Sequence, residues 1–223
     1  MYKQMRFLMT ATAAALAYLS IVLTSHPDLP STPAMTRAQV LALCDTGDLL
    51  FFVNKKAKNW FLAANPVTHL SVIVRNSSGK PLSIETHAVE DGPPGTDRDG
   101  INAYPLEVRL AQDGINTELH LVKMTGPRVI DEKIDELLAS LPALRQKFAY
   151  KYTYISDEVT CRVTFGKNDI SQNMHCGNFA SLVLQKLGIA RLDQRTDCIR
   201  PVDVAWLKLL DGRAYASKAP ING

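Results

Sequence analysis

Hydrophobic and polar residues alternate in two neighbouring runs of the chain. Residues 69–75 (HLSVIVR) and 82–88 (LSIETHA) follow this period of two, and residues 76–80 (NSSGK) between them contain a glycine. Alternating runs on either side of a short glycine-containing turn predict a β-hairpin. The apolar run at residues 48–53 (DLLFFV) predicts a further, buried strand. Two more runs are strand candidates, residues 106–110 and 118–124.

Other runs repeat their apolar residues at helical spacing. Residues 131–148 predict a helix with Asp131 as its N-cap and a kink or break near Pro142. Residues 179–187 predict a second amphipathic helix that is closed by Gly188. Shorter helices are expected at residues 36–43, with Thr36 as N-cap, and at residues 202–210. Together these elements predict an α+β fold in which a small antiparallel sheet packs against helices.

The start of the chain has a different character from the rest. Residues 7–24 contain no charged side chain, and a helix of 18 residues spans roughly 27 Å, close to the thickness of a bilayer core. Lys3 and Arg6 precede this segment, and small residues suited to cleavage are missing directly after it. We therefore favour a transmembrane signal anchor over the alternative, a cleaved signal peptide, with the body of the protein on the non-cytoplasmic side. The expected parts are an anchor at residues 1–24, a spacer at 25–43, a globular domain at 44–215 and a tail at 216–223.

Composition narrows the class of protein. The chain has 223 residues, of which 46% are hydrophobic, and its formal net charge is +3. This is the composition of one folded domain and argues against global disorder. The 25 basic and 22 acidic residues form no dense Lys/Arg run, so we expect no nucleic-acid partner.

Cys176 is the candidate nucleophile. It stands at the predicted start of an amphipathic helix, in the sequence MHCGNF. A helix N-terminus carries partial positive charge and free N–H groups, which lower a thiol pKa and can hold a developing oxyanion. Buried cysteines at helix starts are also common, so this position needs a partner base to indicate catalysis.

The predicted hairpin supplies such a base. If its turn centres on Ser77, His69 lies opposite Glu85, and a histidine held by a carboxylate is what a thiol nucleophile requires. A register slipped by two residues places His69 opposite His87 instead, which makes His87 the alternative third residue.

The order of these motifs resembles that of the circularly permuted NlpC-type papain-like hydrolases, the YiiX/YaeF-like group, which is related to lecithin retinol acyltransferase-like proteins. The matching stretches are Gly47-Asp48-Leu49, Thr68-His69-Leu70-Ser71, Ile84-Glu85-Thr86 and His175-Cys176. The resemblance implies a permuted papain-like fold in which Cys176 is the nucleophile, His69 the base and Glu85 the third polar residue. The chain departs from the family at Gly177-Asn178, where Ser-Glu is frequent.

The implied function is that of a membrane-anchored cysteine hydrolase, of amidase, peptidase or acyl-transfer type, which works through an acyl-enzyme. The expected partners are the lipid bilayer and a peptide, amide, ester or lipid substrate, in a periplasmic, luminal or virion membrane, and no cofactor is expected. The alternative is a catalytically silent papain-like scaffold that serves as a structural or interaction protein at a membrane or in a virion.

The other cysteines allow two further interpretations. A zinc site from Cys161, His175, Cys176 and Cys198 is disfavoured, because the spacings match no familiar zinc finger, and we expect no metal. On an oxidising side of the membrane, Cys161 and Cys198 could form a disulfide that leaves Cys44 and Cys176 free.

Overall fold

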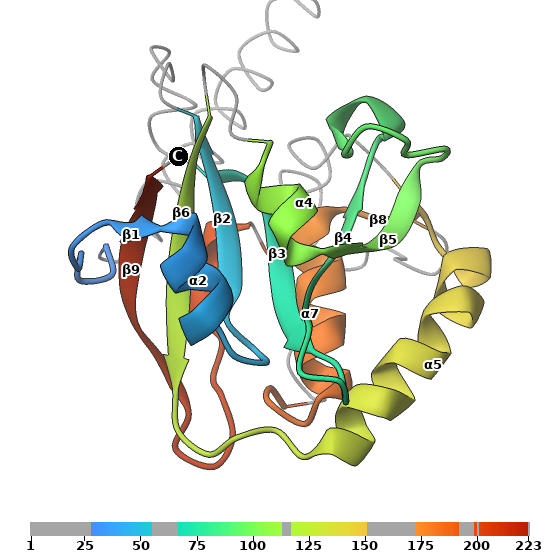
Figure 1. Ribbon diagram of the computed structural model, residues 1–223. Coiled ribbons are helices and arrows are strands. Elements are labelled where there is room, and N and C mark those ends of the chain that lie inside the picture. The colour runs from blue at the N-terminus through green and yellow to red at the C-terminus, as the bar shows by residue number, and fades with distance from the viewer. Residues whose placement is uncertain are drawn as a thin grey trace, which may run out of the picture.

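Four of the five predicted strands lie in one sheet. The computed structural model describes residues 28–54, 67–112, 117–150, 173–191, 199 and 201–222, and in it seven strands lie in the order β1-β9-β6-β2-β3-β4-β5 (Figure 1). The strands are β1 (Met35–Thr36), β2 (Leu49–Asn54), β3 (Val67–Arg75), β4 (Pro81–His87), β5 (Gly100–Pro105), β6 (Thr117–Thr125) and β9 (Ala214–Asn222). Neighbours are antiparallel except β1 and β9, so the sheet is mixed and larger than the small antiparallel sheet that we expected.

A separate parallel pair is formed by β7 (Ala149–Tyr150) and β8 (Asn173–Met174), and β8 leads directly into the last long helix. The helices are α2 (Arg37–Leu43), α4 (Leu106–Leu110), α5 (Asp131–Lys147), α7 (Cys176–Lys186) and the 3₁₀ helices η1 (Val89–Asp91) and η2 (Val202–Trp206). The described residues therefore form an α+β fold, as predicted.

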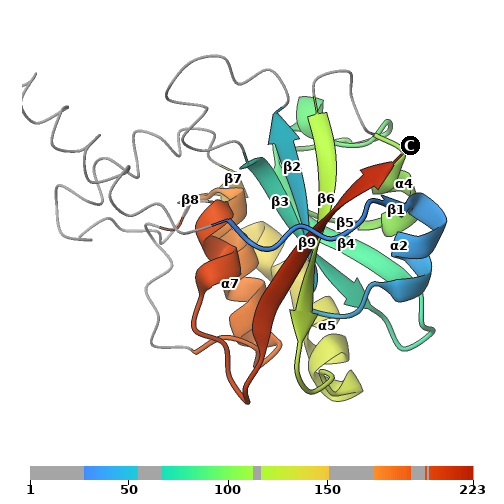
Figure 2. The ribbon, with the colours of Figure 1, turned by 90° about the vertical axis from the view of Figure 1, so that its left-hand side faces the viewer.

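Helices cover both faces of the sheet. Leu49 and Phe51 of β2 share one hydrophobic core with α5 and α7, whereas Leu50 and Phe52 share a second core with α2 and α4. Successive side chains of a strand point to opposite faces, so an uninterrupted apolar run contributes to both cores. Figure 2 shows α7 and α2 on opposite sides of the sheet.

Several local predictions are confirmed. The Thr36 hydroxyl accepts a hydrogen bond from the Gln39 N–H at 3.2 Å, and the Gln39 side chain accepts one from the Thr36 N–H at 2.8 Å, which closes a capping box on α2. β3 and β4 form the expected hairpin, and β2 and β6 lie where strands were predicted. Gly188 follows α7 with φ +68°, as a glycine at a helix C-terminus requires.

The prediction of a strand at residues 106–110 is wrong, because this segment is α4. Its sequence LEVRL alternates apolar and polar residues, but it also places Leu106, Arg109 and Leu110 at helical spacing, and these three are the ones buried. Val108, which a buried strand face would cover, is 41% exposed. The helical period is therefore the one that the core uses.

Two predicted helices differ in detail. Ile130, not Asp131, is the N-cap of α5, and the helix continues through Pro142 without a break. Proline removes only one hydrogen bond of the helix, and buried residues on both sides of it, among them Leu137 and Leu144, anchor the two halves to one core. The helix expected at residues 202–210 is the shorter 3₁₀ helix η2.

The segments expected as spacer and tail belong to the fold where they are described. Leu29 is buried, Ser31 bridges to Lys218, and β1 and α2 fall within the expected spacer. Residues 216–222 of the expected tail belong to β9. Among the described residues no helix is long and apolar enough to cross a membrane, and the predicted anchor at residues 1–24 lies outside them.

Candidate active site

The two strands of the hairpin separate at the end that carries His69. Their pairing runs from Arg75–Pro81 to Val72–Ile84, and beyond this point β3 pairs only with β2, and β4 only with β5. The register, when extended, places His69 opposite His87, so the predicted direct opposition of His69 and Glu85 is wrong by two residues. The alternative register considered above is the observed one.

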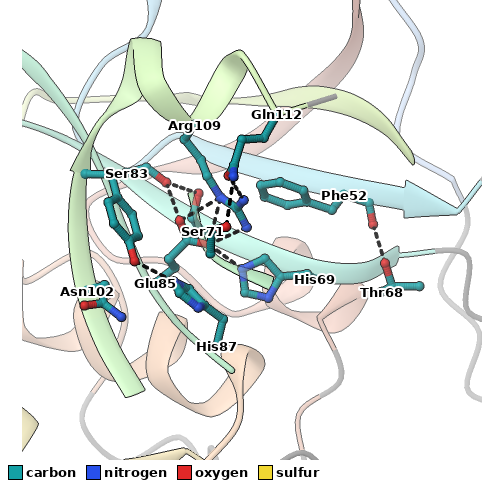
Figure 3. Close-up of polar contacts among 12 residues, drawn as sticks. Phe52, Thr68, His69, Ser71, Ser83, Glu85, His87, Asn102, Arg109 and Gln112 are labelled. Atoms are coloured by element: carbon teal, nitrogen blue, oxygen red, sulfur yellow. Dashed lines mark hydrogen bonds and ion pairs between the residues drawn. The ribbon is translucent and has the colours of Figure 1, made fainter. Parts of the chain in front are cut away.

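His69 nevertheless contacts Glu85. The His69 Nε2 atom lies 2.5 Å from the Glu85 Oε2 atom, and both residues project from the same face of the sheet (Figure 3). The Glu85 side chain is fully buried, and that of His69 is 15% exposed. Glu85 therefore reaches His69 diagonally across the hairpin, a distance that long side chains bridge.

Glu85 has further donors around it that the sequence analysis missed. The Arg109 Nε atom lies 2.9 Å from the Glu85 Oε1 atom, and the Arg109 Nη2 atom lies 3.0 Å from the Glu85 Oε2 atom. The hydroxyl of Ser83 lies 3.3 Å from Oε1 and 2.7 Å from the hydroxyl of Ser71. Ser71 and Ser83 occupy odd positions of the alternating runs, like His69 and Glu85, and this shared period was the available signal for them.

These contacts fix Glu85 as a carboxylate. Burial alone favours the neutral acid and raises its pKa. The positive charge of Arg109 and the hydrogen bond from His69 outweigh this effect and lower the pKa of Glu85 to about 2. Glu85 is therefore ionised throughout the neutral pH range and acts as a hydrogen-bond acceptor.

Cys176 is the first residue of α7, and its N-cap is His175, whose Nδ1 atom accepts a hydrogen bond from the Gly177 N–H at 3.2 Å. α7 packs against β3 and β4 in the core on the other side of the sheet from α4. A side-chain hydrogen bond joins Cys176 to His69, at the level where the two strands are no longer paired. The three predicted residues Cys176, His69 and Glu85 are thus brought together as a chain of contacts.

The contacts favour a thiolate–imidazolium pair. Burial raises the pKa of Cys176, but its hydrogen bonds with His175 and His69 reverse this and lower the pKa to about 6. For His69, burial lowers the pKa, whereas its hydrogen bonds with Cys176 and Glu85 raise it to about 9. Between these two values the thiol is ionised and the imidazole protonated, which is the reactive state of a cysteine nucleophile.

His87, the alternative third residue, does not hold the His69 ring. Its Nδ1–H donates to the carbonyl of Ala88 at 2.7 Å, and its Nε2 atom lies 3.0 Å from the hydroxyl of Tyr104. The rings of His69 and His87 meet edge to face, with centroids 6.2 Å apart. Burial lowers the pKa of His87, so it is a neutral neighbour of the site.

The remaining cysteines lie away from this site or outside the described residues. Cys44 follows α2 in the second core, is 2% exposed, and has its pKa raised by burial. Cys161 and Cys198, on which the disulfide and zinc interpretations depend, lie outside the described part of the chain. Within that part, no group of three His, Cys, Asp or Glu residues is arranged to hold a metal ion.

Comparison of the sequence with protein-family models gives no match, and comparison with curated proteins gives none at a significant level. The chemical interpretation of the site therefore depends on the geometry and charges described above.

Proposed function

We propose that the protein is a cysteine hydrolase or acyltransferase in which Cys176 is the nucleophile, His69 the general acid and base, and Glu85 the residue that orients His69. The observation that carries this proposal is the continuous chain of contacts from the first residue of α7 through His69 to a buried carboxylate. Each member has the ionisation state that thiol catalysis requires.

The proposed reaction has two steps. The Cys176 thiolate attacks a carbonyl carbon of an amide, ester or thioester, and the His69 imidazolium gives its proton to the leaving amine, alcohol or thiol as that bond breaks. Water, or an acceptor in a transferase, then loses a proton to His69 and attacks the thioester, which releases Cys176. Glu85 remains ionised throughout and stabilises the imidazolium each time it forms.

The fold and the order of the residues support a permuted papain-like assignment. The base and the carboxylate come first, on neighbouring strands, and the cysteine comes last, on a helix that packs on those strands. This is the order that the motif resemblance implies. We further propose, from the apolar segment at residues 7–24, that the enzyme is anchored in a membrane with its catalytic domain on the non-cytoplasmic side and acts on peptide, amide, ester or lipid substrates there.

The direct test is labelling with an acyloxymethyl ketone, which alkylates activated cysteines, in the detergent-solubilised full-length protein, followed by peptide mapping. We expect the adduct on Cys176 in the wild type and in Cys44→Ser, and no adduct after heat denaturation. Equal labelling of Cys44 and Cys176 in the native protein, or unchanged labelling after denaturation, would show that Cys176 is an ordinary thiol. Hydrolysis of ester, thioester and amide reporters would then identify the bond class.

A further inference from the structure

A buried arginine contacts the carboxylate of the candidate triad. Arg109 comes from α4, and its side chain is 5% exposed. Its guanidinium contacts the same Glu85 carboxylate that His69 contacts, so that Glu85 is shared by a guanidinium and an imidazole (Figure 3). A buried guanidinium is costly to desolvate unless its donors are satisfied, so its retention here requires an explanation.

Every nitrogen of the Arg109 guanidinium has a partner. Nε and Nη2 bind the two oxygens of Glu85 at 2.9 and 3.0 Å, and Nη1 donates to the side-chain oxygen of Gln112. The Gln112 amide in turn donates to the Gly92 carbonyl at 2.9 Å. The guanidinium carbon also lies 4.3 Å from the centroid of the Phe52 ring, whose neighbour on β3 is His69. This two-pronged, stacked geometry leaves the Glu85 carboxylate one orientation.

The charges of the site alternate in sign along this chain of contacts. Arg109 is positive, Glu85 negative, His69 positive when protonated, and Cys176 negative when ionised. Without Arg109, Glu85 would present an uncompensated buried charge to both His69 and Cys176. A negative charge near a thiol opposes its ionisation, so Glu85 orients His69 without impairing Cys176 only if a cation balances it.

We propose that Arg109 is a positioning residue of the site, which aims the Glu85 carboxylate at His69 and balances its charge so that the Cys176 thiolate can form. This inference rests on the proposed function, and it adds a fourth member, from a different helix, to the Cys-His-Glu set. The other titratable groups around Glu85 are His69 and His87, and the neutral His87 does not replace the charge of Arg109.

The proposal predicts that two substitutions move the alkylation midpoint of Cys176 in opposite directions. Arg109→Met removes a positive charge of the site, and Glu85→Gln removes a negative one. The midpoint pH of Cys176 alkylation by iodoacetamide should therefore rise in Arg109→Met and fall in Glu85→Gln, each by about one unit, the shift that a single partly screened charge near a thiol produces. In the double variant Arg109→Met/Glu85→Gln, it should return to within about half a unit of the wild type.

The control is Arg75→Met. Arg75 lies at the other end of β3, donates to the carbonyls of Cys44 and Leu41, and makes no contact with Glu85. Its loss should leave the Cys176 midpoint unchanged although it also removes a well-bonded guanidinium. Circular dichroism of each variant reports whether the fold is retained.

The outcomes separate this proposal from the proposed function. If Cys176 in the wild type is no more reactive than Cys44, the proposed function fails. If Cys176 is reactive but a folded Arg109→Met has an unchanged or lower midpoint, only the role of Arg109 is refuted. Should Arg109→Met not fold, the double variant decides: a midpoint about one unit above that of Glu85→Gln supports the role, and a midpoint equal to that of Glu85→Gln overturns it.

Discussion

The substitution His69→Gln tests the ion pair on which the mechanism depends. Glutamine removes the imidazolium but keeps a polar side chain of similar length at a position that is 15% exposed. The Cys176 pKa of about 6 depends on hydrogen bonds with both His175 and His69. With only His175 left, we expect the alkylation midpoint of Cys176 to rise to about 8, part of the way to the ordinary thiol value.

The rate of alkylation should change in opposite directions at low and high pH. A thiolate of higher pKa is intrinsically more nucleophilic, with a Brønsted coefficient of about 0.4–0.5, so a rise of two units makes each thiolate roughly eight times faster. At pH 6 the variant has roughly fifty times less thiolate and should react roughly six times more slowly than the wild type. At pH 9 both thiols are largely ionised, and the variant should react roughly eight times faster. The two profiles should cross near pH 7.

The assay is the rate of iodoacetamide modification of the Cys176 peptide by mass spectrometry, from pH 5 to pH 10. His120→Gln is the matched control, because His120 also contacts a glutamate, Glu118 at 2.9 Å, but lies on β6 away from Cys176. A midpoint that stays near 6 in His69→Gln, or that moves equally in His120→Gln, would refute the ion pair.

Three further outcomes follow from the same contacts. Turnover should be highest between about pH 6 and 9, where Cys176 is ionised and His69 protonated, and Cys176→Ala should abolish it while Cys44→Ser leaves it unchanged. The lowered pKa of Glu85, about 2, adds about 3 kcal/mol of stability that is complete above its ordinary value of 4.5 and is lost as the pH falls toward 2. Urea unfolding between pH 6 and 3 should show this loss in the wild type and much less of it in Glu85→Gln. Leu70→Ala empties a fully buried position of β3 and should cost about 2–5 kcal/mol in the same measurement, with Val108→Ala, 41% exposed, as the mild control.

The hairpin shows what an alternating pattern can and cannot predict. The period of two assigned His69 and Glu85 to one face, and this is where both lie. The pattern contains no information on which residues of the two strands are opposed, because the turn sets the register. Gly79 takes φ +75°, and the turn at residues 76–80 centres on Ser78 and not on Ser77, which shifts the pairing by two residues.

Arg109 could not be placed from the sequence for a related reason. In LEVRL the periods of two and of 3.6 fit equally well, and five residues are too few to separate them. A strand would have placed Arg109 on the face opposite Leu106 and Leu110, whereas the helix buries all three on the sheet. The start of α7 was easier to place, since polar residues precede Cys176 and a long apolar helical pattern follows it.

The observed register does not decide which residue contacts His69, because Glu85 makes the contact although the extended register places His87 opposite. A shift of two residues keeps every side chain on its face, so it exchanges one candidate partner for the next without removing either from the site. The choice between them is made by neighbours outside the hairpin. Arg109 binds both oxygens of the Glu85 carboxylate and keeps it ionised as an acceptor for His69, while Ala88 and Tyr104 engage both ring nitrogens of His87. A histidine whose two ring nitrogens are both engaged cannot accept a hydrogen bond from the His69 N–H. A carboxylate bound by Arg109 still has a free lone pair that can accept this hydrogen bond. The residue that contacts His69 is therefore set by neighbours that include side chains from α4 and β5, two elements that carry none of Cys176, His69 and Glu85.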